Sequence, residues 1–149
     1  ALEDITTSTS SVELVLITDM PATIANIFAS KAIEVPIQVV VATKFETDQT
    51  GRFTGDFDSI NKSRMLTALD EQHNWDHVIA AGDTVRDLRM QSTADQFIAV
   101  SGQGQINEHL QEPYVTVSES NPESIHESHD VYVPKEVPLG VVLRTVIST

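Results

Sequence analysis

The sequence predicts an α/β protein in which helices connect the strands of a parallel β-sheet. Two observations support this fold class. Short apolar runs recur along the chain, and such runs are typical of strands buried on both faces of a sheet. Segments with apolar residues at helical spacing lie between several of these runs. Alternating strands and helices favour a parallel sheet, because parallel strands need long crossover connections.

The expected strands share apolar, often β-branched residues and are bounded by turn-forming residues. In chain order they lie at residues 12–17, 37–42, 78–81, 97–100, 114–117 and 131–133. Residues 45–53 contain the turn Asp48-Gln49-Thr50-Gly51 between two half-polar segments, which predicts a hairpin flap at the edge of the sheet. The order of the strands within the sheet is not predicted.

The expected helices are indicated by apolar residues that repeat every three or four positions. Pro21 suits the first turn of the first helix, which Thr18 or Asp19 would cap, and Lys62 begins the second. The apolar positions of the four helices are, in order, Ile24, Ile27 and Phe28; Met65, Leu66 and Leu69; Ile106 and Leu110; and Leu139, Val142, Leu143 and Val146.

The length of 149 residues predicts one domain with a sizeable core. Residues 1–11 are rich in Ser and Thr and are expected to form a flexible segment, so the folded domain is expected to span residues 12–149. No apolar run is long enough for a transmembrane helix, and no signal peptide is recognisable, which favours a cytoplasmic protein. Cysteine is absent, which excludes disulfides and thiolate metal sites.

The net charge of −13 arises from 22 acidic and 9 basic residues, which are spread along the chain. Such a surface repels nucleic acid and anionic membranes, so neither is an expected partner. Abundant acidic residues with little lysine resemble the composition of halophilic proteins, in which high salt screens the self-repulsion. An ordinary acidic cytoplasmic protein is the alternative interpretation.

The most informative stretch is residues 78–90, which reads V-I-A-A-G-D-T-V-R-D-L-R-M. The apolar run predicts a buried strand, Gly82 permits a tight turn with close backbone approach, and a helix is expected from Asp83 onward. Asp83 and Asp87 are four residues apart, so their carboxylates are expected to be neighbours. Ligands bind at the carboxyl ends of strands in open α/β sheets, and close carboxylates repel unless a cation lies between them. The pattern predicts a Mg²⁺ site at Asp83 and Asp87.

A simpler interpretation treats both aspartates as caps of a helix N-terminus, where the helix dipole favours negative charge. Other candidate sites are weaker. The five histidines have no zinc-type spacing apart from the loose pair His126 and His129, and they are expected at the surface. Residues 101–104 read S-G-Q-G, which lacks the further glycine and the basic residues of a phosphate-cradling loop.

Residues 78–90 resemble the fourth signature of the haloacid dehalogenase (HAD) superfamily of phosphatases, in which a buried strand runs into Gly-Asp-x-x-x-Asp. Residues 14–18 resemble its second signature, an apolar strand ending in Ser or Thr. This implies that the hydroxyl of Thr18 binds the phosphoryl group. Lys62 stands where the lysine of the third signature is expected, which implies phosphate binding by its point charge. Taken singly, Thr18 is most simply a helix cap and Lys62 a solvated helix residue.

Residues 42–46 and 51–55 resemble the hairpin of the phosphoserine-phosphatase-like members of this superfamily. The resemblance implies a three-layer Rossmann-like, HAD-like parallel sheet with a small hairpin flap. It also implies Mg²⁺ as cofactor and a small phosphorylated substrate. It covers residues 12–100, and the order and spacing of the signatures carry more weight than any single one.

The sequence lacks the first signature of the superfamily, an Asp-x-Asp-Gly-Thr run after a central strand. In the family its first aspartate attacks phosphorus, so no catalytic nucleophile is expected in this chain. Residues 4–8 are the nearest match, but too few residues precede them for a central strand. The strand between those of Thr18 and Asp83 is therefore expected to be missing. Self-association or an N-terminal partner chain is expected to fill its place.

Two classes of function follow from the sequence. The first is a HAD-like hydrolase of the Mg²⁺-dependent phosphomonoesterase type, or the C-terminal part of one, inactive as this chain alone. The second is a non-catalytic α/β binding or assembly module that keeps the scaffold.

Overall fold

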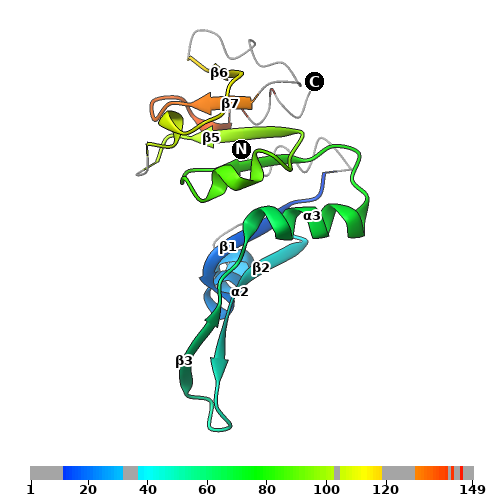
Figure 1. Ribbon diagram of the computed structural model, residues 1–149, viewed down its shortest axis with the longest axis vertical. Helices are drawn as coiled ribbons and strands as arrows, with labels where there is room; N and C mark the ends of the chain where they lie inside the picture. Colours follow the sequence, from blue (N-terminus) through cyan, green and yellow to red (C-terminus); the bar gives the residue numbers. More distant parts are fainter. Residues whose placement is uncertain are drawn as a thin grey trace.

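The computed structural model describes residues 12–31, 37–102, 105–118, 130–140, 142 and 145. These residues form a mixed α/β structure, which confirms the predicted class (Figure 1). The described strands form two sheets, whereas one continuous parallel sheet was expected. The predicted flexible segment at residues 1–11 lies outside the described residues, as do His126, His129, Leu143 and Val146.

The first sheet has the order β1-β2-β3 and combines parallel with antiparallel pairing. Strands β1 (Val15–Pro21) and β2 (Val39–Thr47) are parallel, and β2 pairs with β3 (Phe53–Asp58) in the antiparallel sense. The prediction ended the first strand at residue 17, but β1 continues through Pro21. The extension follows from a shift in register, after which Pro21 pairs with Thr43 at the end of the strand, a position that tolerates proline.

The predicted hairpin flap is confirmed as β2, β3 and the turn at residues 48–51, and it projects from the rest of the molecule (Figure 1). The carboxylate of Asp48 accepts hydrogen bonds from the backbone N–H groups of Thr50 at 2.8 Å and Arg52 at 3.0 Å. Gly51 adopts a φ of 80°, which glycine adopts without strain. The residues that stabilise this turn are therefore neighbours in the sequence, which is why the sequence predicts the hairpin.

Helix α2 (Ala22–Lys31) connects β1 to β2 but does not bury its apolar stripe. Ile24 and Ile27 are each 53% exposed and Phe28 is 42% exposed, whereas the small Ala25 is fully buried. The stripe was expected to contact the core. Periodicity predicted the helix correctly, but close packing through Ala25 turns the larger side chains toward the outside.

Helix α3 (Lys62–His73) begins at Lys62, as predicted. The side chain of Asn61 caps its N-terminus by accepting a hydrogen bond from the backbone N–H of Arg64, and Asn74 ends it in the left-handed conformation. Leu66 and Leu69 are buried, as the apolar spacing predicts. Capping and periodicity together fix where Lys62 lies on the helix.

The second sheet is entirely parallel and has the order β4-β5-β7-β6. The strands are β4 (Ile79–Gly82), β5 (Gln96–Val100), β6 (Tyr114–Thr116) and β7 (Asp130–Val133). Phe97 and Ala99 pack into one buried cluster with Leu66 and Met90, and Ile98 packs into a second cluster. β5 is therefore buried on both faces, as its continuous apolar sequence predicts.

The helix expected from Asp83 is reduced to a single 3₁₀ turn, η1 (Asp87–Met90). Residues 83–86 form bends and a turn, and Val85 is exposed. The prediction failed because the backbone N–H groups of Asp83 and Thr84 bond the side chain of Asp87, which shapes a loop. A second 3₁₀ turn, η2 (Ile106–Glu108), replaces the short helix expected there.

Residues 139, 140, 142 and 145 are helical, in agreement with the predicted closing helix. Val142 is fully buried in the same cluster as Ile98. Within the described part of the chain, no helix combines the length and the apolar character needed to span a membrane.

Candidate functional site

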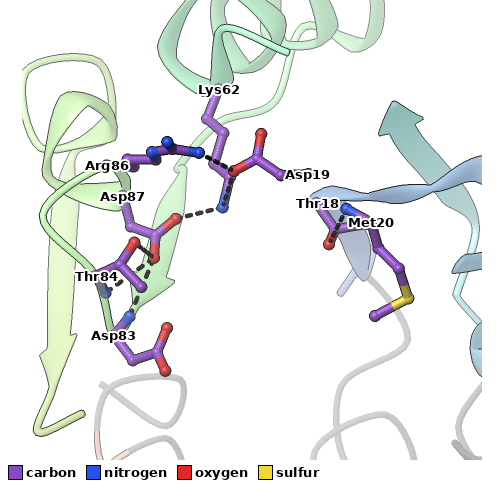
Figure 2. Close-up of polar contacts among 8 residues, drawn as sticks. All are labelled: Thr18, Asp19, Met20, Lys62, Asp83, Thr84, Arg86 and Asp87. Atoms are coloured by element: carbon purple, nitrogen blue, oxygen red, sulfur yellow. Dashed lines mark hydrogen bonds and ion pairs between the residues drawn. The ribbon is translucent and has the colours of Figure 1, made fainter. Parts of the chain in front are cut away.

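The candidate functional site is a polar cluster at the first residue of α3, where β1 and the loop after β4 meet (Figure 2). The Nζ atom of Lys62 donates a hydrogen bond to Oδ1 of Asp87 at 2.5 Å and lies 3.7 Å from Oδ2 of Asp19. The side chains of Lys62 and Asp87 are only 13% and 6% exposed. Lys62 thus joins the carboxyl ends of two strands that belong to different sheets.

The second carboxylate oxygen of Asp87 organises the loop that follows β4. Its Oδ2 accepts hydrogen bonds from the backbone N–H groups of Asp83 at 3.2 Å and Thr84 at 3.0 Å, and from the Thr84 hydroxyl at 2.7 Å. Both oxygens of this buried carboxylate therefore have partners. A buried carboxylate is stable only under this condition.

The pKa of Asp87 lies below its ordinary value. Burial on its own would raise this pKa, because a low-dielectric environment disfavours the charged form. The hydrogen bonds from Lys62 and Thr84 and the positive charge of Lys62 outweigh burial and lower it. Asp87 is therefore a permanent anion at neutral pH and has no tendency to act as a proton donor.

Gly82 makes room for Asp87. A Cβ atom at Gly82 would overlap the Cβ atom of Asp87 and would lie 2.7 Å from its Cγ and 2.9 Å from its Oδ2. The close approach expected at this glycine is therefore confirmed, and the group that approaches is the side chain of Asp87. Only a residue without a side chain at position 82 lets this carboxylate reach Lys62.

The structure separates Asp83 from Asp87, although their spacing predicted a shared cation. The side chain of Asp83 points away from Asp87 (Figure 2), and Lys62 supplies the positive charge at Asp87. The described residues include no group of three or more histidine, aspartate or glutamate side chains that could hold a metal ion. Asp83 is an exposed carboxylate of this cluster.

Thr18 lies in β1 beside the cluster, but its hydroxyl is engaged locally. Its Oγ1 accepts a hydrogen bond from the backbone N–H of Met20 at 3.2 Å. This bond closes a turn within the end of β1 and does not cap α2, which begins at Ala22. No hydrogen bond or ion pair among the described residues joins Thr18 to Lys62.

Three further residues of the cluster were missed as site residues. Asp19 lies within ion-pair distance of both Lys62 and Arg86, and the Thr84 hydroxyl bonds Asp87. Asp19 follows Thr18 directly at the end of a strand, so the sequence could have indicated that both residues lie at the same edge of the sheet. The pairing of Asp19 with Lys62 and Arg86 depends on how α3 packs, and no local pattern indicates it.

A shallow depression of about 420 Å³ lies next to the cluster and is lined by Asn61, Ser63, Arg64, Arg89 and Ser92. It contains none of the predicted site residues. The cluster itself holds three carboxylates, Asp19, Asp83 and Asp87, against two cations, Lys62 and Arg86. The formal charge of the cluster is therefore negative.

Comparisons of this chain with protein-family models, with curated proteins and with solved structures found no match.

Proposed function

We propose that this chain is the C-terminal part of a HAD-like hydrolase of the Mg²⁺-dependent phosphomonoesterase type, inactive by itself. In this proposal the two sheets belong to one three-layer Rossmann-like fold, and the attacking carboxylate comes from outside these 149 residues. The observation that carries the proposal is the position of Lys62. Its ammonium group is nearly buried between the ends of β1 and β4, where open α/β sheets bind their ligands.

The proposed roles follow from charge and from free donor atoms. Lys62 would hold a phosphate oxygen of a small phosphorylated substrate. Thr18 would donate its hydroxyl proton to the same group while keeping its bond from Met20. Mg²⁺ would compensate the excess of carboxylates, and Asp83 would be its protein ligand. A magnesium ion held by one or two carboxylates is completed by water and substrate phosphate.

In this proposal none of the described residues attacks phosphorus. Both oxygens of Asp87 are engaged, and Asp19 faces Lys62 and Arg86. Positioning and charge alone do not replace a nucleophile in a covalent phosphoryl-transfer mechanism. The proposal therefore separates binding, which this chain retains, from catalysis, which it lacks.

We expect no turnover of p-nitrophenyl phosphate by the full 149-residue chain in the presence of Mg²⁺, measured as release of p-nitrophenol. The control is Asp83→Ala, which is expected to give the same background. Hydrolysis that survives repurification and disappears in Asp83→Ala would show that this chain contains its own nucleophile.

We expect the full chain to bind Mg²⁺ weakly, and more tightly in the presence of inorganic phosphate, because phosphate supplies oxygens that the protein lacks. Calorimetric titration of Mg²⁺ with and without phosphate measures both affinities. Asp83→Asn is expected to abolish the heat, whereas Asp76→Asn, the same charge change at an exposed site, is expected to leave it unchanged. Equal heats from the wild type and Asp83→Asn would remove the metal assignment.

The alternative function, a non-catalytic α/β binding or assembly module, is favoured by the closed Lys62–Asp87 pair. A buried ion pair in which both carboxylate oxygens already have partners has a purely structural interpretation. The titration of Mg²⁺ with and without phosphate distinguishes the two functions. If the Lys62–Asp87 pair is purely structural, phosphate is expected to leave the affinity for Mg²⁺ unchanged.

A further inference from the structure

Two arginines line the shallow depression between the start of α3 and the segment that follows β4. Arg64 belongs to α3 and Arg89 to η1, and the remaining lining residues are Asn61, Ser63 and Ser92. None of the five lining residues is acidic, although the chain has 22 acidic and 9 basic residues. The two arginines therefore give the lining a positive formal charge within an acidic protein.

The two walls of this depression are held together by a hydrogen bond and by the core. The hydroxyl groups of Ser63 on α3 and Thr93 beyond η1 share a hydrogen bond of 2.7 Å. Leu66 of α3 and Met90 of η1 pack in the same buried cluster. A ligand between the two walls therefore has to order only side chains, which keeps the entropic cost of binding low.

The lining offers hydrogen-bond donors that the protein itself does not use. The guanidinium groups of Arg64 and Arg89 form no hydrogen bond or ion pair within the described part of the chain, whereas Lys62 and Arg86 of the neighbouring cluster are paired. Oδ1 of Asn61 accepts a hydrogen bond from the backbone N–H of Arg64 at 3.1 Å, so its amide nitrogen is left as a donor. Guanidinium and amide nitrogens donate hydrogen bonds and do not accept them, so the complementary ligand is an anion.

We propose that this depression, here named the arginine depression, binds the phosphate group of a small, hydroxylated phosphate monoester. Such a group carries between one and two negative charges at neutral pH, which two arginines balance. A guanidinium group binds two phosphate oxygens at once. The proposed ligand is thus selected by the charge and by the donor geometry of Arg64 and Arg89.

The size and polarity of the arginine depression indicate a ligand larger than phosphate itself. Its volume of about 420 Å³ lies within the range of small-molecule sites. All five lining residues are polar, so the body of the ligand is polar as well. The Ser92 hydroxyl donates to the carbonyl of Arg89 at 3.3 Å, which leaves its lone pairs to accept a hydrogen bond from a ligand hydroxyl.

The arginine depression is separate from the phosphate site proposed at Lys62. Lys62 does not line the depression, and its ammonium group is bonded to Asp87. The lining contains no carboxylate that could hold Mg²⁺, so binding in the arginine depression is expected without a divalent cation. The inference therefore does not rest on the proposed function.

The test is a titration of the full, ¹⁵N-labelled chain with glycerol 2-phosphate and, separately, with inorganic phosphate. EDTA replaces Mg²⁺, and about 0.1 M sodium chloride screens charges farther away than about 10 Å. NMR shifts of the backbone amide groups are expected to saturate at Ser63, Arg64 and Ser92. The dissociation constant is expected on the order of 1 mM, because both arginines are exposed to water. Glycerol 2-phosphate is expected to bind more tightly than inorganic phosphate, because its hydroxyl groups add contacts.

Three charge-removing variants test the assignment to the two arginines. Arg64→Gln and Arg89→Gln are each expected to weaken binding about fivefold, and the double variant is expected to abolish saturation. Arg52→Gln in the hairpin is the matched control and is expected to bind as the wild type does. All three side chains are exposed, so the variants are expected to keep the fold.

Four results would overturn the inference. Equal weakening by Arg52→Gln would show that net charge attracts phosphate. Shifts confined to the amides of Thr18, Asp83 and Thr84 would place the phosphate at the Lys62 cluster, in support of the proposed function alone. Shifts that do not saturate, or that sodium chloride of equal ionic strength reproduces, would show only screening. Tighter binding of inorganic phosphate than of glycerol 2-phosphate would remove the monoester as the ligand.

Discussion

Replacing Asp87 with alanine is expected to lower the free energy of unfolding by about 3–5 kcal/mol, the usual effect of removing one partner of a buried ion pair. The variant leaves the ammonium of Lys62 nearly buried with only the more distant Asp19 beside it. It also removes the acceptor for the backbone N–H groups of Asp83 and Thr84. Chemical denaturation followed by tryptophan fluorescence measures the change, because Trp75 packs against the same core.

The control for this prediction is Asp83→Asn, which alters the neighbouring carboxylate and leaves the ion pair intact. It is expected to change stability by less than about 0.5 kcal/mol, as most surface substitutions do. A similar loss in both variants would show that loop charge, and not the Lys62–Asp87 pair, stabilises this region.

The stabilisation by Asp87 is also expected to depend on pH. Its pKa in the folded chain lies below the ordinary value of 3.8. A carboxyl group of this kind contributes its full stabilisation above pH 3.8, and the contribution is lost as the pH falls through the lower, folded-state pKa. The difference in stability between the wild type and Asp87→Ala is therefore expected to stay constant at neutral pH and to shrink below pH 3.8. A difference that grows on acidification would contradict the assignment.

Replacing Gly82 with alanine is expected to destabilise the chain by about 1–3 kcal/mol through overpacking, and by more if Asp87 loses Lys62. The added methyl group would overlap the Cβ atom of Asp87, which cannot move without withdrawing its carboxylate. Thermal unfolding measures the effect. A double variant, Gly82→Ala with Asp87→Gly, removes the clash, because glycine has no Cβ atom; the single variant Asp87→Gly gives its separate effect.

The double variant makes the prediction specific. If overlap with Asp87 is the cause, the two substitutions are expected to be less destabilising together than the sum of their separate effects. Gly55→Ala is the matched control for losing a glycine. No atom lies within 4 Å of a Cβ at that position, although its φ of 101° gives alanine a backbone strain of its own. Additive effects of the two substitutions at positions 82 and 87 would remove steric overlap as the explanation.

Much of the secondary structure was predictable because its causes lie within a few residues. Apolar runs indicated the strands around Phe97 and Val131, the turn at Asp48 indicated the hairpin, and Asn61 with Asn74 defines the ends of α3. The stretch after β4 was less predictable. Its residues favour a helix by composition, but the side chain of Asp87 bonds the N–H groups of the loop and leaves one 3₁₀ turn.

The pairing of the candidate site residues was not predictable. Asp83 and Asp87 were singled out by strand, glycine and spacing and Lys62 by the family resemblance, and the structure places Lys62 and Asp87 in contact. The sequence did not indicate that Asp87 would pair with Lys62 while Asp83 points away, or that Asp19 would be the residue of β1 nearest the ammonium group.

The sequence by itself determined the α/β class, the parallel pairing of strands linked by helices, and the hairpin. These features follow from local sterics, periodicity and turn chemistry. Only the tertiary structure decided the division into two sheets, the strand order, the exposure of the apolar side chains of α2, and the partner of each carboxylate. Lys62 and Asp87 are 25 residues apart, and their contact exists only because α3 packs across the ends of both strands.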